Sequence, residues 1–425
     1  MMSSEAARKS AAGGTSFLGV QSRTTRIVMA CLALICLLYL TTQSSVSSAK
    51  SLTRSARLMR TPIDYTSAHS SCGRTDDDKM IVLVTGAAGF VGMHTSLTLK
   101  ASGHGVLGLD NFNDYYPVPL KRARQKALLA AGVYVAERDL ADEGAFAEAL
   151  GVCAFTHVLH LAAQAGVRYA VVNPQSYVRS NLMGFVEVME AVRHLDKSIP
   201  VVYASSSSVY GLNTKQPFSE EDRVDSPASL YAATKKSNEV MAHAYWNIYG
   251  LSLTGLRFFT VYGPFGRPDM AYFSFTKAVL AGSPIKVFQN PADGGELSRD
   301  FTYIDDIVHG CIRSLETSGA SGKGVAKPPR IFNLGNTQPT EVSVMVNAIE
   351  KATGRKAIRK FVPMPATGDV VSTFADVDHA RTELGYSPST GIEEGISKFV
   401  TWYLDYYGPN GYERATPEEL AYKGY

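Results

Sequence analysis

A tyrosine and a lysine four positions apart are the first residues of this chain that could do chemistry. In "SLYAATKK", Tyr231 and Lys235 would share one face of a helix, because residues i and i+4 are neighbours there. An ammonium beside a phenol favours the phenolate and lowers a pKa that is normally near ~10, which would provide a base at neutral pH. Ordinary amphipathic helices also produce this spacing, so the pair needs support from the rest of the chain.

Four consecutive serines precede this pair. They occupy positions 205–208 in "ASSSSVYG" and follow the apolar run 200–204. Serine is a poor core residue and a poor helix former, so a serine run at the end of a strand predicts hydroxyl groups that face a cleft. The alternative interpretation is an ordinary polar loop.

A glycine-rich turn lies upstream, in "LVTGAAGFVGMH". The apolar run 80–84 predicts a buried strand, after which Gly86 would form the tight turn. Gly89 would let the backbone approach a pyrophosphate, and Gly92 would let the following helix pack closely on the strand. Asp110 follows the glycines at the spacing along the chain that is typical of the carboxylate in dinucleotide-binding folds. Such a carboxylate binds a ribose 2′-OH and repels a 2′-phosphate, which indicates NAD rather than NADP. A structural turn with a capping aspartate is the alternative.

Short apolar runs alternate with helical stretches along the middle of the chain. Strands this apolar, separated this regularly by helical patterns, predict a parallel sheet covered on both faces, which is an α/β fold of the Rossmann-like, doubly wound type. The runs are 80–84, 105–110, 133–139, 156–163, 200–207 and 252–259.

The pattern changes at about Gly263, where Pro/Gly-rich loops and shorter helices begin. This predicts a smaller lobe over the carboxyl ends of the strands, where ligands bind in open α/β sheets. We expect the nucleotide-binding domain over 79–262, a substrate-binding lobe over 263–410 with strands that return to the main sheet, and a C-terminal tail over 411–425.

The first 78 residues differ in composition from the rest. Residues 27–40 form an uninterrupted apolar run that reaches bilayer thickness only with its flanks, so we expect a transmembrane signal anchor over 27–43. A tail over 1–26 would precede it, and a disordered Ser/Arg-rich stem over 44–78 would follow. A signal peptide or an organelle transit peptide is the alternative.

Charge and cysteine content exclude several classes of protein. The basic excess lies in residues 1–75, which carry nine Lys/Arg against two acidic residues, so the globular part has no nucleic-acid footprint. Cys72, Cys153 and Cys311 are scattered without CxxC spacing or histidine partners. We therefore expect neither a disulfide framework nor a metal site.

Together these motifs resemble the extended short-chain dehydrogenase/reductase superfamily, and more specifically the membrane-anchored plant and algal UDP-glucuronate 4-epimerases. The resemblance runs from about residue 80 to 403. One departure is Phe265, where the family usually has tryptophan. The resemblance rests on "LGLDNFNDYYPVPLKRAR", "HLAAQAGVRYA", "YASSSSVYG", "SLYAATKK", "LRFFTVYGPFGRPDMA" and "RDFTYIDDIV".

The resemblance implies epimerisation at C4 through a 4-keto sugar, by transient hydride transfer to tightly bound NAD. Tyr231 would take the C4 hydroxyl proton, Lys235 would lower the pKa of that tyrosine and order the ribose, and Ser206 would hydrogen-bond the same sugar oxygen. The keto sugar would then turn about its pyrophosphate tether and receive the hydride on its other face. Bound NAD would thus act as a catalytic cofactor.

For a glucuronate, the intermediate is a β-keto acid that must be kept from losing carbon dioxide. The resemblance implies that Ser207, Ser208 and Thr260 hydrogen-bond the carboxylate, with Arg267 as a counter-charge. Related decarboxylases and dehydratases carry an acid at the position of Ser208, which argues against both reactions here.

The same resemblance assigns the remaining ligand contacts. For UDP it implies Arg299 at the phosphates, Asn181 between cofactor and sugar, and Val287 and Phe288 near uracil. Without the resemblance, Arg299 is equally well explained as an ion-pair partner of Asp300 or Asp305. The implied NAD site comprises Gly86, Gly89, Phe90, Val91, Gly92, Asp110, Asn111, Asp139, Leu140, Leu161, Ala162, Ala163, Tyr231 and Lys235.

Two other functions stay open. A neutral UDP-hexose 4-epimerase would commonly carry asparagine at the position of Thr260, and a catalytically silent nucleotide-sugar-binding protein would not need the Ser206, Tyr231 and Lys235 set. The resemblance also implies a Golgi-membrane protein of type II topology with a lumenal catalytic domain, UDP-galacturonate supply for polysaccharides, and a homodimer.

Overall fold

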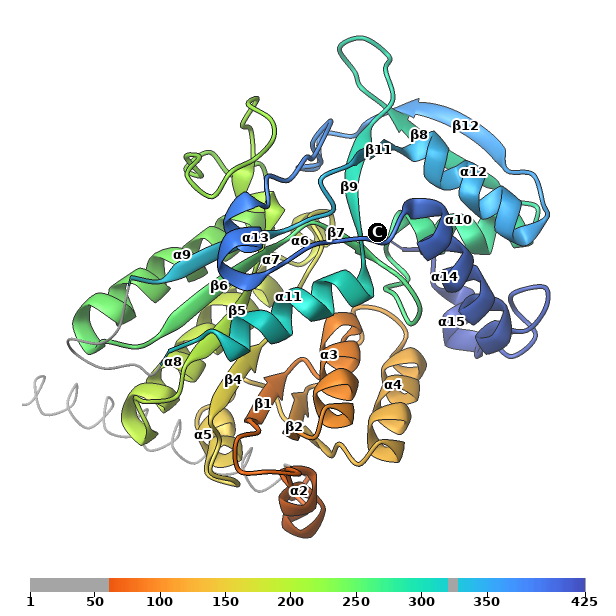
Figure 1. Ribbon diagram of the computed structural model, residues 1–425. Coiled ribbons are helices and arrows are strands. Elements are labelled where there is room, and N and C mark those ends of the chain that lie inside the picture. Colours follow the sequence, from red (N-terminus) through yellow and green to blue (C-terminus); the bar gives the residue numbers. More distant parts are fainter. Residues whose placement is uncertain (1–60, 320–327, 425) are drawn as a thin grey trace, which may run out of the picture. The chain divides into compact units, whose positions relative to one another are not determined.

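A seven-stranded parallel sheet forms the centre of the protein in the computed structural model, which describes residues 61–319 and 328–424 (Figure 1). The strand order β10-β6-β5-β4-β1-β2-β3 confirms the doubly wound α/β fold, and the order reverses between β1 and β4. The strands are β1 (Ile81–Thr85), β2 (Gly105–Asp110), β3 (Val135–Glu137), β4 (His157–His160), β5 (Val201–Ser206), β6 (Leu253–Phe258) and β10 (Arg330–Leu334).

Helices cover both faces of this sheet, which explains why its strands are apolar throughout. Within β1, Val82 and Val84 belong to one core cluster, whereas Leu83 belongs to the cluster on the opposite face. The first face packs α3 (Phe90–Ala101), α4 (Val118–Ala130), α11 (Ile304–Glu316) and α13 (Asp378–Leu384). The second packs α5 (Ala145–Leu150), α8 (Gly184–Leu195) and α9 (Leu230–Tyr249).

A smaller lobe stands over the carboxyl ends of the central strands and has its own core (Figure 1). Its sheets are β11-β9-β7 and the parallel pair β12-β8. The strands are β7 (Thr260–Tyr262), β8 (Pro284–Gln289), β9 (Ser298–Tyr303), β11 (Pro339–Glu341) and β12 (Ile358–Pro363). The helices are α10 (Ala271–Leu280), α12 (Val342–Thr353), α14 (Ile392–Tyr407) and α15 (Pro417–Ala421).

Short helical segments follow strands β4 and β5. They are α6 (Tyr169–Val172), α7 (Pro174–Tyr177), the π-helix η1 (Val178–Met183) and the 3₁₀-helix η2 (Ser207–Tyr210). The serine run therefore ends β5 and begins η2.

The expectation of a disordered stem up to residue 78 is wrong for its last part. Helix α2 (Tyr65–Ser71) begins at an N-cap, where Asp64 accepts hydrogen bonds from Thr66 and Ser67. Ile63 and Ala68 are buried in the core cluster that also contains Leu107. Two buried apolar side chains in a polar stretch are enough to pack this helix, although they are too few to produce a sequence signal.

The expectation that no disulfide would form is also wrong. Cys72 and Cys153 are bonded, and 81 positions separate them in the chain. The bond links the end of α2 to the segment after α5. Spacing rules recognise local cysteine pairs, so a pair that only the fold brings together escapes them.

The two ends of the chain were predicted to be a membrane anchor and a C-terminal tail. The C-terminal tail is partly ordered, because α15 begins with a capping box between Thr416 and Glu419. The predicted anchor over 27–43 lies outside the described residues. Among the helices of residues 61–319 and 328–424, none is both long and apolar enough to cross a bilayer.

Candidate active site

One cavity of about 410 Å³ lies at the carboxyl ends of the central strands, where the strand order reverses. β1, β2, β4, β5 and β6 each contribute a residue at or just after their ends, namely Gly86, Asp110, Leu161, Ser206 and Phe258. The predicted residues that line it are Gly86, Gly89, Phe90, Val91, Gly92, Asp110, Asn111, Asp139, Leu140, Leu161, Ala162, Ala163, Ser206, Ser207, Ser208, Tyr231, Lys235, Thr260, Arg267 and Arg299.

The glycine turn fits a dinucleotide pyrophosphate. Gly86 has a φ of +68°, and a Cβ there would lie 2.8 Å from the backbone nitrogen of Ala162. A Cβ on Gly92 would lie 2.0 Å from the carbonyl oxygen of Gly86, so helix and turn pack too closely for any side chain. Helix α3 begins after Gly89 without a side-chain cap, which leaves its first N–H groups available to an anion at the cavity.

Asp110 ends β2 at the edge of the cavity. Its carboxylate accepts hydrogen bonds from the backbone N–H groups of Ala88 (3.0 Å) and Phe112 (2.9 Å), which fix its position beside the glycine turn. Each carboxylate oxygen has a second lone pair, so ribose hydroxyls can still be accepted. The donor and acceptor groups of this end of the cavity therefore fit NAD.

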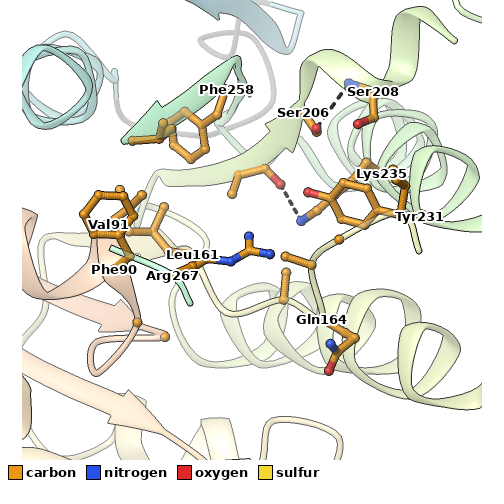
Figure 2. A pocket seen from close by; sticks show the side chains of 18 of the residues that line it. Phe90, Val91, Leu161, Gln164, Ser206, Ser208, Tyr231, Lys235, Phe258 and Arg267 are labelled. Carbon is orange, nitrogen blue, oxygen red and sulfur yellow. Dashed lines mark hydrogen bonds between the residues drawn. The ribbon is translucent and has the colours of Figure 1, made fainter. Parts of the chain in front are cut away.

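Tyr231, Lys235 and Ser206 meet at the other end of the cavity (Figure 2). Ser206 ends β5, and its hydroxyl lies close enough to the phenol of Tyr231 to affect the pKa of that phenol. The Ser206 hydroxyl accepts from the N–H of Ser208 at 3.2 Å. Lys235 donates to the backbone carbonyl of Ala204 at 2.8 Å, which ties helix α9 to β5.

Burial has the largest effect on how this pair titrates. It raises the pKa of Tyr231, while the nearby hydroxyl of Ser206 and the charge of Arg267 act in the opposite direction. Burial also lowers the pKa of Lys235 to about 7. The expectation that the ammonium lowers the phenol pKa is therefore wrong: the pKa of the phenol is raised, because both groups are removed from water.

Behind the serine run lies a buried ion pair that the sequence did not reveal. Glu239 accepts from Arg257 through Nε and Nη2, both at 2.9 Å, and from the hydroxyl of Ser205 at 2.7 Å. Ser205 thus directs its hydroxyl to this ion pair, although it also lines the cavity together with Ser206, Ser207 and Ser208. Glu239 follows Lys235 by four positions, so the only sequence pattern that could have indicated its place was helical spacing, which puts it on the same helix face as Lys235.

Arg267 extends its guanidinium into the cavity near Tyr231 (Figure 2). Its Nε and Nη2 donate to Asp269 at 3.0 and 2.5 Å. Burial opposes this charge, but the carboxylate of Asp269 outweighs it, and the pKa of Arg267 is raised well above its usual value. Among the described residues, Nη1 has no protein acceptor, so it is available to an anionic ligand.

Arg299 also lines the cavity, and it pairs with neither of the two aspartates considered as alternatives. Its Nη1 donates to the backbone carbonyls of Ser298 (2.8 Å) and Val371 (3.1 Å). Asp300 instead accepts from backbone N–H groups, including that of Asn336. Burial lowers the pKa of Arg299, and a phosphate would compensate its charge.

Three predicted residues are not at the cavity wall. Asn181 is buried and uses its amide to bind Gln164 and Thr234, so it supports the wall from behind. Val287 is buried in the core of the lobe, so its side chain does not reach the cavity, and its place near uracil stays a prediction. Phe288 packs under the guanidinium of Arg168 at 4.9 Å, and that arginine pairs with Asp369, which does line the cavity.

His160 is buried in the sheet and does not line the cavity. His160 ends β4, is hydrogen-bonded to Thr85 at 2.8 Å, and has a pKa lowered to about 3 by burial. No group of three or more potential metal ligands occurs in residues 61–319 and 328–424.

The amino-acid sequence is similar to those of known proteins. Residues 82–335 match the model of the NAD dependent epimerase/dehydratase family. UDP-glucuronate 4-epimerase 1 of Arabidopsis thaliana is 58% identical over 334 residues, which cover 77% of this chain and 78% of the relative.

Solved structures resemble the fold as well. The UDP-glucuronic acid 4-epimerase from Bacillus cereus in complex with UDP-glucuronic acid and NAD has 32% identity and a TM-score of 0.68, over 76% of this chain and 98% of that one. The UDP-glucose 4-epimerase of Thermus thermophilus in complex with NAD has 29% identity and a TM-score of 0.66, over 76% and 98%.

Proposed function

The chain belongs to the NAD dependent epimerase/dehydratase family, and from this premise we propose that it is a UDP-glucuronate 4-epimerase. It interconverts UDP-glucuronate and UDP-galacturonate and so supplies UDP-galacturonate for polysaccharide synthesis. The observation that carries the proposal is that one cavity contains the glycine turn, the Tyr231 and Ser206 pair and the cationic Arg267.

The reaction begins at the C4 hydroxyl group, whose carbon carries no acidic hydrogen. Tyr231 accepts the hydroxyl proton, and Ser206 holds the same oxygen by a hydrogen bond. Bound NAD supplies the acceptor for the C4 hydride and returns that hydride to the other face of the sugar. Lys235 carries a positive charge when protonated, and it stabilises the phenolate and orders the ribose.

The carboxylate of the sugar must be held while C4 is a ketone. Ser207, Ser208 and Thr260 offer hydroxyl donors at the cavity wall, and Nη1 of Arg267 offers a charged one. The diphosphate binds at Arg299, whose only protein acceptors among the described residues are backbone carbonyls. These groups distinguish an acidic sugar from a neutral hexose.

Location and assembly form a further part of this proposal. The chain is anchored in the Golgi membrane by residues 27–43 with the catalytic domain in the lumen. The Cys72–Cys153 bond supports a lumenal location, because disulfides persist in oxidising compartments.

A homodimer is supported by exposed apolar side chains on η1 and α9, including Met183, Val240 and Ile248. Analytical ultracentrifugation would test the dimer by measuring its mass in solution.

Anaerobic incubation of the full-length protein with UDP-glucuronate and no added NAD⁺ tests the proposal, with the sugars followed by NMR. A chain that began at residue 79 would lose α2 and Cys72, so the full chain is required. We expect UDP-galacturonate without UDP-pentose. Turnover of UDP-glucose but not UDP-glucuronate would reassign the chain to the neutral-sugar epimerases, and binding without turnover would make it a silent binding protein.

A further inference from the structure

Two side chains from the nucleotide-binding half, His94 and Arg124, hold the backbone of the loop 263–270, which carries Arg267. His94 on α3 is hydrogen-bonded through Nε2 to the carbonyl of Pro264 at 2.9 Å. Arg124 on α4 donates to the carbonyl oxygens of Phe265 at 2.7 Å and of Gly266 at 3.1 Å. The loop is therefore bound through consecutive backbone carbonyls that directly precede Arg267.

Arg124 is the unusual member of this set, because its side chain is fully buried. Within residues 61–319 and 328–424 it has no ion-pair partner, and its remaining donors bind the carbonyl of Ala88 (3.1 Å) and the hydroxyl of Tyr116 (2.6 Å). A buried guanidinium without a carboxylate is costly unless every donor finds an acceptor. Arg124 thus joins the glycine turn to the loop.

The backbone of the loop shows why such support is needed. Phe265 has a φ of +55°, a conformation that residues with a side chain rarely adopt. Its ring packs on Trp402 with the centroids 4.9 Å apart. The hydrogen bond from Arg124 to the carbonyl of Phe265 and the packing of its ring on Trp402 therefore hold this residue in its unfavourable backbone conformation.

A further contact, made by Tyr115, reaches Arg267 through its carboxylate partner Asp269. The hydroxyl of Tyr115 donates to Oδ2 of Asp269 at 3.0 Å, and Nη2 of Arg267 binds the same oxygen. Tyr115 lies in the loop after β2. Gly166 leaves room for this contact, because a Cβ there would lie 2.5 Å from the Tyr115 hydroxyl and 3.6 Å from Nη2 of Arg267.

We propose that Arg124 and Tyr115 are positioning residues that hold Arg267 in the orientation that keeps the 4-keto sugar from losing carbon dioxide. The inference rests on the proposed function and adds two residues that were not predicted from the sequence, of which Tyr115 lines the cavity and Arg124 does not. Arg124 fixes the backbone before Arg267, and Tyr115 fixes the carboxylate that orients its guanidinium.

The side reaction explains why orientation matters. After oxidation at C4, the C5–C6 bond can break, so that its electron pair enters the C4 carbonyl system and carbon dioxide leaves. The resulting enolate takes a proton at C5 and becomes a 4-keto pentose, with no further change in oxidation state. Cleavage requires the C5–C6 bond to align with the carbonyl π system, and a fixed carboxylate prevents that alignment.

The test measures the ratio of UDP-pentose products to UDP-galacturonate formed by the full-length protein from UDP-glucuronate. Tyr115→Phe removes one hydroxyl group, and we expect it to raise this ratio about tenfold, the effect of losing a hydrogen bond to a charged group. Arg124→Met should raise the ratio at least as much. If Arg124→Met fails to fold by circular dichroism, Tyr115→Phe decides the question.

Tyr407→Phe is the matched control, because it removes a tyrosine–carboxylate hydrogen bond to Glu419 outside the cavity. Its ratio should equal that of the wild type. An unchanged ratio in Tyr115→Phe, or an equal rise in the control, overturns the inference even if turnover falls. Failure of the wild type to convert UDP-glucuronate would instead overturn the proposed function, so the two failures are distinguishable.

Discussion

Glu239 and Arg257 form a buried bidentate ion pair directly behind the serine run, with both N–O distances at 2.9 Å. Glu239 lies on α9 four residues after Lys235, and Arg257 lies on β6. Glu239 also accepts the hydroxyl of Ser205. The pair therefore fixes the helix that carries Tyr231 against the strands that present Ser206.

Replacing one partner tests this relationship. We expect Glu239→Gln to lower the free energy of unfolding by about 3 kcal/mol or more, because the charge of Arg257 would stay buried without its anion. Urea denaturation would measure the change. The control is Glu393→Gln, which removes an exposed partner of Lys351 and should leave the stability unchanged. Equal effects of the two substitutions would contradict the assigned role.

The phenol of Tyr231 is expected to be essential for turnover and dispensable for binding. Tyr231→Phe should lower kcat by about 10²–10⁴-fold, the usual contribution of a positioned general base. Titration calorimetry with UDP-glucuronate should show little change in affinity, because the ring remains in place. Conversion at the wild-type rate would show that another group takes the C4 proton.

The buried amine of Lys235 should make stability depend on pH. Its pKa falls from 10.5 to about 7 on burial, so the unfolded chain binds a proton between these values that the folded chain does not. The buried amine therefore destabilises the folded protein most at pH 7 and below, and this destabilisation diminishes as the pH rises to 10.5.

Lys235→Met isolates that effect. We expect the variant to be more stable than the wild type at pH 7 and the difference to shrink at pH 9.5, although the variant is inactive. Urea denaturation at the two pH values measures the difference between the proteins, which cancels the titration of other groups. A difference that does not change with pH would mean that Lys235 keeps an ordinary pKa in the folded state.

The Cys72–Cys153 bond should contribute to stability without affecting the site. Cys72→Ser combined with Cys153→Ser is expected to lower the free energy of unfolding by about 2–4 kcal/mol, because the unfolded chain is no longer cross-linked. The KM for UDP-glucuronate should not change, since neither cysteine lines the cavity. A reducing agent should destabilise the wild type and leave the double variant unaffected.

The local patterns were the most informative part of the sequence. The apolar runs predicted the parallel sheet because burial on both faces leaves no place for polar residues. The glycine turn and the Tyr231 and Lys235 spacing predicted groups that the structure brings to one cavity. The resemblance added Arg267 and Arg299, which no local pattern distinguishes from ordinary surface arginines.

By itself, then, the sequence determined which strands, turns and helical faces form, because short-range spacing reports hydrogen-bonding geometry and burial. Only the tertiary structure decided that Cys72 bonds Cys153, that Glu239 pairs with Arg257, and that Val287 lies in the core. It also decided that Arg124 reaches the loop before Arg267. Each of these contacts joins residues distant in the chain or depends on how deeply a side chain is buried, and neither property is encoded in local spacing.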